Sequence, residues 1–511
     1  MKIERSSVPI GLVALTGLLA VVLFVLFLPV WQTVLYGLFI QTPALWYWLG
    51  VGGVIAVLAA RLGHNGTAVG ILTVAVVLAL LVGPFLSGVY AQEDIVTQQR
   101  FDEVSVLPNT SDEHVRVLPR HVADTYADSS MQFPVYQLTR SDITYHDGHY
   151  TWSQGLAPDR ITVALLGSQH GAFFTNMETQ EKDVDIVEND ISCGMGQLFT
   201  DSYAYRMNVK RFDVNHKPAT AFNLQHNGEL HIAQSYVSHE WRFGNPLDGR
   251  LPMPYVVPRY GGTLTIDGDC SVRDIPAADV PESNLLDNQS TYPYDLARFR
   301  VSSMQLSHGL LNAVFVGEDV PQIASTPGQG NSQPFTVPMA GGDLSYFVAM
   351  EPSGSGTGIY QVYVLDAQTG DIQFVEYNET QTGPQRAADF VRRENPRVNW
   401  AQGESGTMTV SEPIPVVKDG VLFWHVRVVP TDGAGIAYTA FVNAKTSEVT
   451  EVSGDKEIYA FVRDGEVDNI NSPTSPDKPT IQIAIIEDGT VVRMVNVSAN
   501  ATIRITQDDD D

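Results

Sequence analysis

Histidine and carboxylate residues that could carry out chemistry are concentrated in the first half of the chain. Nine of the twelve His lie between residues 114 and 239. His239-Glu240 begins the pattern of zinc peptidases, in which a second His one helical turn later shares the metal. Phe243 stands where that His must lie, so this pattern predicts no zinc site.

The other stretches that could carry out chemistry are also incomplete. Residues 167–171 (Gly-Ser-Gln-His-Gly) contain a serine and a histidine but lack the Gly-x-Ser-x-Gly elbow that exposes a nucleophile. Two groups of His could form a site only if the fold brought them together: His146 with His149, and His226 and His231 with His239. The sequence therefore predicts no catalytic, cofactor-binding or metal-ligating residue, and no cofactor.

The N-terminal part of the chain is almost uncharged, since Arg61 is the only formal charge from residue 6 to 91. Three apolar runs are long enough to cross a hydrocarbon core about 30 Å thick. These runs are Pro9–Val30, Ala44–Ala60 and Thr67–Val89. The stretch between residues 30 and 43 is interrupted, and we expect it to extend the first helix or to lie in the membrane interface. A cleavable signal peptide would be a single run followed by a small-residue cleavage site, so the pattern favours retained helices.

Basic and aromatic residues predict an orientation for these helices. Lys2, Arg5 and Arg61 are expected on the cytoplasmic side, and an aromatic belt on the other. The belt residues are Trp31, Trp46, Tyr47 and Trp48. This assignment gives a cytoplasmic N-terminus, three crossings and an extracytoplasmic location for residues 92–511. A two-crossing interpretation would place the large domain inside.

The part of the chain after residue 91 is strongly acidic. It carries 57 of the 58 acidic residues and 28 of the 31 basic ones. Such a surface repels nucleic acid and anionic lipid. Its acidic, Lys-poor balance resembles proteins of salt-adapted organisms, and an ordinary acidic secreted domain is the alternative. The expected partners are the lipid bilayer and other membrane or surface proteins, a second copy of the chain included, and no nucleic acid.

Cysteine usage agrees with an extracytoplasmic location. Cys193 and Cys270 are the only two cysteines, so one disulfide can form. It would close a loop of about 77 residues and add a few kcal/mol by restricting the unfolded chain. The alternative is a pair of unrelated buried thiols. Five acceptor patterns for N-glycosylation give weak support: Asn109, Asn288, Asn378, Asn496 and Asn500.

The clearest strands lie between Asp419 and Val452. A turn at Asp419-Gly420 precedes a strand over Val421–Val429, and a second hairpin runs from Ile436 to Val452 around Asn443–Ser447. Alternation of apolar residues with β-branched or aromatic content predicts antiparallel strands that bury one face.

Three earlier segments share this order of elements, which is helix, strand, turn, strand, a Gly/Pro gap and a hairpin. The four predicted helices are Pro119–Met131, Met195–Met207, Tyr294–Phe315 and Arg386–Glu394. The earlier hairpin turns are Asp147-Gly148, Asn227-Gly228 and Asp366–Gly370. Further strands are predicted at Ile161–Leu166, Ala172–Asn176 and Asp183–Val187.

The hairpins at Tyr363–Ile372 and Tyr438–Val449, each preceded by a helix and a strand, resemble PepSY-type domains. The resemblance covers about residues 290–453 and extends to 119–276 by analogy. It implies small extracytoplasmic modules of one helix on an antiparallel sheet, as in peptidase propeptides and membrane-anchored proteins. Asn443 and Ser447 stand where the family has Asp and Gly, which weakens the resemblance of the last copy, but Asn also tolerates turn conformations.

The predicted fold is therefore α+β, with N-terminal transmembrane helices followed by tandem PepSY/cystatin-like units. The predicted domains are a membrane domain with three helices (1–91), two divergent units (92–290), two PepSY-like units (291–454), and a β-hairpin extension with an acidic tail (455–511). A single helix on a small sheet buries little apolar surface, so neighbouring units should share cores. Trp152, Tyr346 and Trp424 are accordingly predicted to be core residues under their helices.

Two classes of function fit this organisation. The first is a membrane-anchored extracytoplasmic binding or assembly protein without catalysis. The second is a membrane-tethered peptidase regulator, or a metal-dependent hydrolase that uses the histidine-rich first half.

Overall fold

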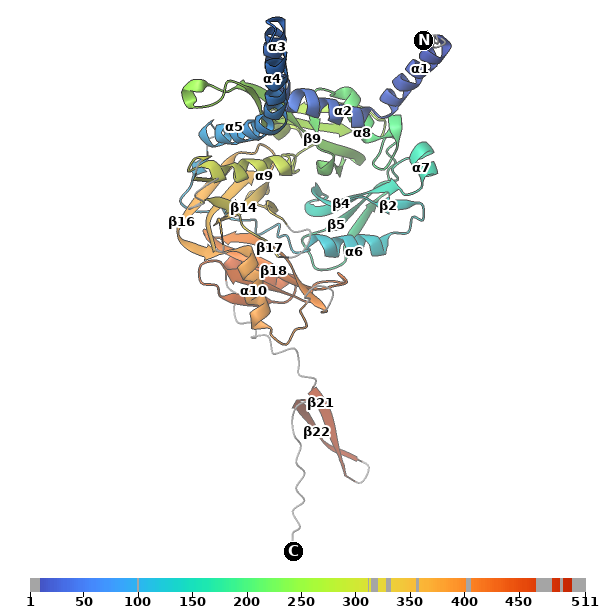
Figure 1. The fold of residues 1–511 in the computed structure, drawn as a ribbon. Helices are drawn as coiled ribbons and strands as arrows, with labels where there is room; N and C mark the ends of the chain where they lie inside the picture. The colour runs from blue at the N-terminus through green and yellow to red at the C-terminus, as the bar shows by residue number, and fades with distance from the viewer. Residues whose placement is uncertain are drawn as a thin grey trace. The chain divides into compact units, whose positions relative to one another are not determined.

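Long apolar runs form the helices at the start of the chain, and segments in which apolar residues alternate form the strands that follow. The computed structural model describes residues 10–98, 101–310, 312–313, 320–327, 332–354, 358–400, 406–465, 480–487 and 490–498. The fold is mixed α and β, with N-terminal apolar helices and several small sheets (Figure 1). The chain divides into two compact units, Met1–Arg463 and Asp464–Asp511.

Five apolar helices open the first unit: α1 (Ile10–Leu26), α2 (Leu28–Tyr36), α3 (Pro43–Arg61), α4 (Asn65–Val77) and α5 (Gly83–Gln98). Two continuous helices, Pro43–Arg61 and Asn65–Gln98, are long and apolar enough to cross a membrane, and a bent pair would make a third. The pair is Leu15–Leu26 with Leu28–Gln41, bent by 84°. The interrupted stretch after residue 30 therefore turns away from the first helix and does not extend it.

Four sheets follow, each preceded by a helix. The first has α6 (Arg120–Ser130), β2 (Tyr136–Leu138), β3 (Asp142–His146), β4 (His149–Pro158), β5 (Ala172–Asn176) and β6 (Val184–Val187). The second has α8 (Tyr203–Lys210), β7 (Asn215–His216), β8 (Phe222–His226), β9 (Glu229–Phe243), β10 (Pro254–Ile266) and β11 (Val272–Pro276). The third has α9 (Tyr294–Ser302), β12 (Pro321–Ile323), β13 (Phe335–Pro338), β14 (Leu344–Pro352), β15 (Gly358–Asp366) and β16 (Ile372–Thr382). The fourth has α10 (Pro384–Glu394), β17 (Met408–Lys418), β18 (Val421–Pro430), β19 (Tyr438–Asn443) and β20 (Val449–Val452).

These sheets share one strand order. Each is an antiparallel meander in which consecutive long strands pair, as in β14–β15–β16 and β18–β19–β20. In the first three sheets the first strand is divided into two pieces, and both pieces pair with the same next strand. The pairs of pieces are β2 and β3 on β4, β7 and β8 on β9, and β12 and β13 on β14. In the fourth, β17 is continuous but bulged between Ser411 and Ile414. A short strand β1 (Asp102–Glu103) adds parallel to β16.

Three helix and strand predictions need correction. Residues 161–166, predicted as a strand, form helix α7 (Ile161–Leu166), because β4 and β5 already have partners on both sides. The helix predicted over Tyr294–Phe315 gives way to a 3-10 turn after Ser302. The one predicted over Met195–Met207 begins only at Tyr203, where the Ser202 side chain accepts from the N–H of Tyr205.

A last helix packs on the fourth sheet. In α11 (Asp455–Asp464), Phe461 stacks on Phe441 of that sheet at 4.1 Å between ring centroids. In the second unit, β21 (Thr480–Glu487) and β22 (Thr490–Ser498) form the predicted hairpin. Its turn at Asp488-Gly489 and the acidic end lie outside the described residues.

Neighbouring sheets share their cores. Tyr346 of β14 lies in one core with Leu296 of α9, and Phe347 lies in another with Trp424 of β18. The three residues predicted to be core, Trp152, Tyr346 and Trp424, are all buried. Phe347 follows Tyr346 along the strand and is buried on the opposite face, because both faces of the third sheet are covered. The predicted bridge between Cys193 and Cys270 is present, with 5.4 Å between their Cα atoms.

A buried carboxylate joins the first and fourth sheets. Glu412 occupies the β17 bulge with φ of 34° and accepts from Arg116 Nη2 at 2.6 Å and from Arg427 Nη2 at 3.2 Å. Its other oxygen accepts from the backbone N–H of Arg120 at 3.2 Å, at the start of α6. Burial alone would raise the pKa of Glu412, but the two guanidinium groups outweigh it and hold that pKa below its usual value.

His425 lies on β18 beside this cluster and is completely buried. Its ring stacks on Phe441, and neither ring nitrogen has a hydrogen-bond partner among the described residues. Burial, with the charges of Arg427 and Arg116, holds the pKa of His425 well below its usual value. His425 is therefore neutral in the folded protein near neutral pH.

Removing the Glu412 carboxylate should leave two buried guanidinium groups without their anion. We predict that Glu412→Ala lowers the free energy of unfolding by roughly 3–5 kcal/mol. Asp389→Ala breaks a half-exposed pair with Arg392 and should cost less than about 1 kcal/mol. Denaturant unfolding of both variants measures the difference, and equal small losses would contradict this role for Glu412.

Protonation of His425 should be linked to stability. The unfolded chain binds a proton below about pH 6.5 that the folded protein excludes, so the unfolding free energy should fall as the pH drops below that value. His425→Phe keeps the ring and removes the proton site, so its unfolding midpoint should depend less on pH. His308→Phe, at an exposed position, is the control. Identical pH profiles for wild type and His425→Phe would disprove the linkage.

Candidate functional site

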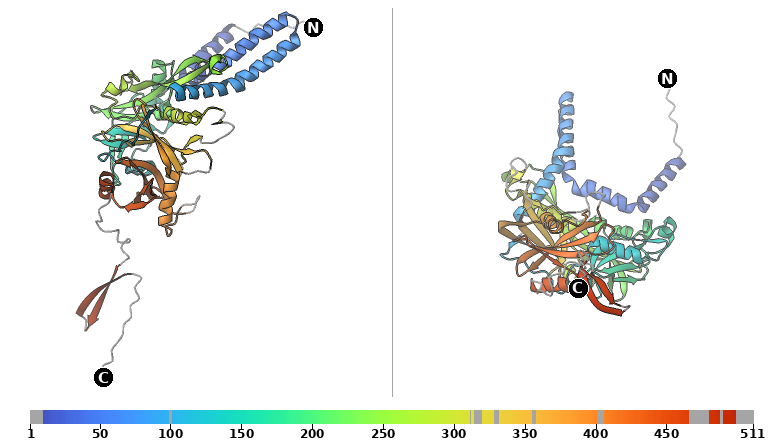
Figure 2. Two further views of the ribbon diagram at one scale, coloured as in Figure 1. Left: turned by 90° about the vertical axis from the view of Figure 1, so that its left-hand side faces the viewer. Right: turned by 90° about the horizontal axis from the view of Figure 1, so that it is seen from below.

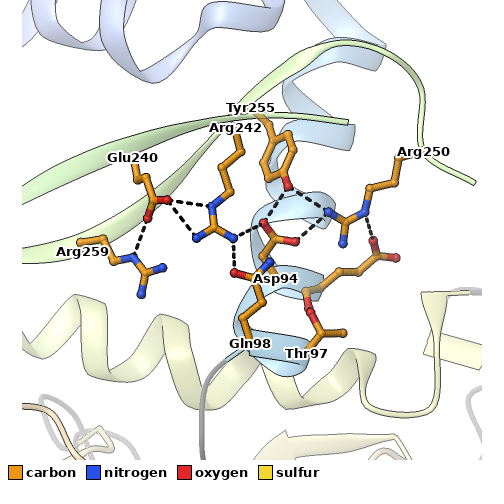
Figure 3. A network of polar contacts seen from close by, with 9 residues as sticks. Asp94, Thr97, Gln98, Glu240, Arg242, Arg250, Tyr255 and Arg259 are labelled. Carbon is orange, nitrogen blue, oxygen red and sulfur yellow. Dashed lines mark hydrogen bonds and ion pairs between the residues drawn. The ribbon is translucent and has the colours of Figure 1, made fainter. Parts of the chain in front are cut away.

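The end of helix α5 meets the β9–β10 hairpin in a network of charged side chains (Figure 3). Asp94 of α5 is 3% exposed and accepts three hydrogen bonds. The donors are Tyr255 Oη at 2.6 Å, Arg250 Nη1 at 2.7 Å and Arg242 Nη1 at 2.9 Å. We call these four residues the polar junction. It ties the last apolar helix to the second sheet.

Further contacts extend the polar junction on both sides. Glu93 accepts from Arg250 Nε at 3.2 Å, and the Tyr90 hydroxyl accepts from the backbone N–H of Leu251 at 2.8 Å. On the other side, Glu240 pairs with Arg242 and with Arg259. An open cleft of about 840 Å³ lies against the junction.

The local sequence explains this arrangement. Tyr90, Asp94 and Gln98 are spaced four residues apart, so they share one face of α5, and all three bond to the β9–β10 hairpin. On β9, Glu240 and Arg242 lie on one face of the strand because alternate residues point the same way. Arg242 is the direct cross-strand partner of Tyr255. The polar residues of α5 therefore begin where the helix reaches the sheet.

The charges of the polar junction are fixed near neutral pH. Partial burial would lower the pKa of Arg242 and of Arg250, but hydrogen bonds to Asp94 outweigh it and raise both values. Burial, followed by the bond to Asp94, raises the pKa of Tyr255 to about 12. None of these three donors titrates near pH 7, so the junction is suited to holding two elements together and not to proton transfer.

The predicted zinc-like pattern lies on a strand. His239 and Glu240 are neighbours on β9, so their side chains point to opposite faces. His239 Nδ1 is 3.0 Å from the Tyr36 hydroxyl of α2, and burial lowers the pKa of His239 to about 4, aided by Lys217. His231 is eight residues away on the same strand, about 26 Å by the rise of a strand. The fold therefore does not bring the group of His226, His231 and His239 together.

The His146 and His149 pair flanks the predicted hairpin turn, but the two rings have different partners. His146 Nε2 is 2.8 Å from Asp185, whereas His149 Nδ1 is 2.8 Å from Glu178. Glu178 is buried and also bonds His114 Nδ1 at 2.8 Å. Sequence reasoning missed this His114–Glu178–His149 group, because 64 residues separate His114 from Glu178 and no local motif marks it.

His114 also lines a cleft of about 460 Å³ with Tyr145 and Gly341. A histidine held by a buried carboxylate can act as a base when a substrate reaches its other nitrogen. Ser111 lines the same cleft, and its hydroxyl accepts from the backbone N–H of His114 at 2.9 Å. The described segments contain no group of three or more His, Cys, Asp or Glu able to hold a metal ion.

The stretch 167–171 connects α7 to β5. Gln169 is fully buried and donates to Asn223 Oδ1 at 2.7 Å, and its Oε1 accepts from the N–H of Met195 at 2.8 Å. His170 Nδ1 lies 2.8 Å from Asp190. These side chains hold the first and second sheets together, which gives the stretch a structural role.

Comparison of the chain with protein-family models, curated proteins and solved structures found no match.

The polar junction should break when its carboxylate is removed. Asp94→Ala removes the acceptor that two guanidinium groups and a hydroxyl share, at a cost of roughly 3–5 kcal/mol. Arg242 and Arg250 keep their pairs with Glu240 and Glu93. Amide hydrogen exchange in residues 90–98 and 244–253 should then accelerate by on the order of a hundredfold or more. Arg259→Ala, at the exposed end of the network, should change exchange little. Unchanged exchange in Asp94→Ala would show that the junction does not hold the helix.

Proposed function

We propose that this protein is a multi-pass, membrane-anchored, extracytoplasmic binding or assembly protein, in which PepSY-like repeats form the module outside the membrane. The observation that carries the proposal is the way the apolar helices join the folded domain. They leave large apolar side chains uncovered along their length, and their main contacts with the domain lie in α2, in Gly37–Gln41 and at the ends of α3 and α5.

The uncovered side chains favour a membrane location. Val54 of α3 is 63% exposed and Leu81 is 68% exposed, within runs of similarly exposed residues. An exposed apolar surface of this size on a water-soluble protein is uncommon, whereas a lipid bilayer covers it. At 19 residues, α3 is about 28 Å long, which matches a hydrocarbon core about 30 Å thick.

The connections to the domain fit two crossings between α2 and the end of α5, and α1 would add a third. After α1 the chain reaches the domain, where Gln32 of α2 donates to the carbonyls of Phe212 and Val214. It reaches the domain again at the end of α5, through Asp94. If α1, α3 and the α4–α5 helix each cross once, both arrivals lie on one side and Arg61 lies on the other. This topology agrees with the rule that basic residues stay inside.

The four sheets support the binding or assembly role. Their common order of helix and antiparallel meander is the arrangement that PepSY-like units would have. Shared cores and the Glu412 cluster join them into one framework. Such a framework suits a protein that presents a surface to a membrane or surface partner, a second copy of the chain included.

The alternative proposal is a membrane-tethered peptidase regulator or a metal-dependent hydrolase. The cleft beside His114 is the feature that favours it. Metal analysis of the purified protein distinguishes the two proposals, because a stoichiometric transition metal would support the hydrolase and its absence would remove the metal-dependent form.

The orientation can be tested with protease added to intact cells. We expect digestion of the acidic domain and survival of a short fragment that contains the apolar helices, because only the domain is exposed to the outside. Digestion after lysis is the control for protease access. Protection of the whole chain in intact cells would contradict the proposed orientation.

A further inference from the structure

Exposed apolar side chains on the folded domain gather around the ends of the apolar helices. They come from the end of α8, from the end of β9 and from the β9–β10 connection. We call this set the apolar rim: Val209, Phe212, Trp241, Phe243, Leu247 and Leu251. Their exposed fractions run from 41% for Phe212 to 93% for Leu247.

We propose that the apolar rim docks into the headgroup region of the bilayer, so that the domain rests on the membrane surface as well as being anchored to it. This inference rests on the proposed membrane anchoring. It adds a second lipid-binding surface, on the folded domain itself.

Contacts with the apolar helices place the rim at the membrane-facing side of the domain. Phe243 packs edge-on against Tyr47 of α3 at 5.8 Å between ring centroids. The backbone of Leu251 bonds the Tyr90 hydroxyl of α5, and the carbonyl of Phe212 accepts from Gln32 of α2. In Figures 1 and 2 the green β9–β10 hairpin runs beside the blue helices.

The two faces of β9 differ in character at this end. His239, Trp241 and Phe243 alternate along the strand and therefore share one face, where Tyr36 and Tyr47 contact it. Glu240 and Arg242 lie on the opposite face, in the polar junction. The apolar face continues past the helices without cover from the described part of the chain, since Trp241 is 54% exposed.

Helix α2, like the rim, exposes apolar side chains. Its buried residues are the polar Gln32 and Tyr36, whereas Trp31 and Val34 are exposed. A helix on a water-soluble protein shows the reverse arrangement. This inverted pattern fits a helix that lies in the membrane interface with its apolar face toward lipid. Continuity between α2 and the rim makes the bilayer the occupant that the structure favours over a second protein.

The exposed Trp241 fits the headgroup region, because Trp is enriched at this depth of a membrane. The arginines near the rim do not make a basic patch, since Arg242 and Arg250 pair with Asp94. The rest of the acidic domain is repelled by anionic headgroups, so the rim is the surface that can approach them.

Fluorescent labelling of single introduced cysteines tests the rim. Both native cysteines are in the disulfide, so an added cysteine is the only reactive thiol among the described residues. We would label Leu247→Cys, Val54→Cys and Val421→Cys separately with an environment-sensitive fluorophore, in full-length protein reconstituted in nanodiscs. All three positions are exposed, so the label should not disturb folding. The quencher is a lipid with a nitroxide near the headgroup end of its acyl chain.

We expect quenching at residue 247 in the rim and at residue 54 in α3, but not at residue 421 in the fourth sheet. If the labels at residues 247 and 421 are both unquenched while the label at residue 54 is quenched, the rim does not bind lipid. The proposed membrane anchoring would still stand. Lack of quenching at 54 would overturn the anchoring itself. A blue shift of the fluorescence emission at residue 247 that appears only when two copies of the chain associate, without quenching by the lipid, would make the rim a contact between proteins.

Discussion

The buried carboxylate of Asp94 is the interaction on which the relation between helices and domain depends. It lies at the end of a 34-residue apolar helix and receives hydrogen bonds from both strands of one hairpin and from the loop between them. A buried carboxylate is stable only when it is fully paired, so the helix end and the hairpin cannot separate without a large cost in free energy. Because the partners keep their charges near neutral pH, this connection is permanent under ordinary conditions.

A second constraint shapes the domain. Each sheet is too small to bury enough apolar surface by itself, so the four sheets cover one another. The third sheet has α9 on one face and the core of the fourth sheet on the other, which is why both Tyr346 and Phe347 are buried. Glu412 adds a buried polar contact to this packing, since its carboxylate accepts hydrogen bonds from both Arg116 and Arg427. Because the sheets pack as one framework, the contacts between the apolar helices and the second sheet fix the helices relative to the other sheets as well.

Local patterns in the sequence predicted the elements well where the pattern was strong. Asp147-Gly148 and Asn227-Gly228 mark tight turns with positive φ, and the structure has hairpins at both. The sequence could not predict that residues 161–166 form a helix, because that outcome depends on sheet edges already being occupied. It also could not reveal the polar junction, since Asp94 and Arg250 are 156 residues apart and each looks like a solvated charge. The exposure of Trp241 and Phe243 could not be predicted either, because in the sequence they stand only within an incomplete zinc-peptidase pattern.

We propose that the apolar helices cross a membrane and hold the domain outside. A membrane-impermeant maleimide applied to intact cells tests it directly with two single-cysteine variants, Leu166→Cys in α7 and His64→Cys between α3 and α4. Both positions are exposed, and the native cysteines are bridged. The account predicts labelling at residue 166 in intact cells and labelling at residue 64 only after the membrane is permeabilised. Labelling at residue 64 with protection of residue 166 would contradict it.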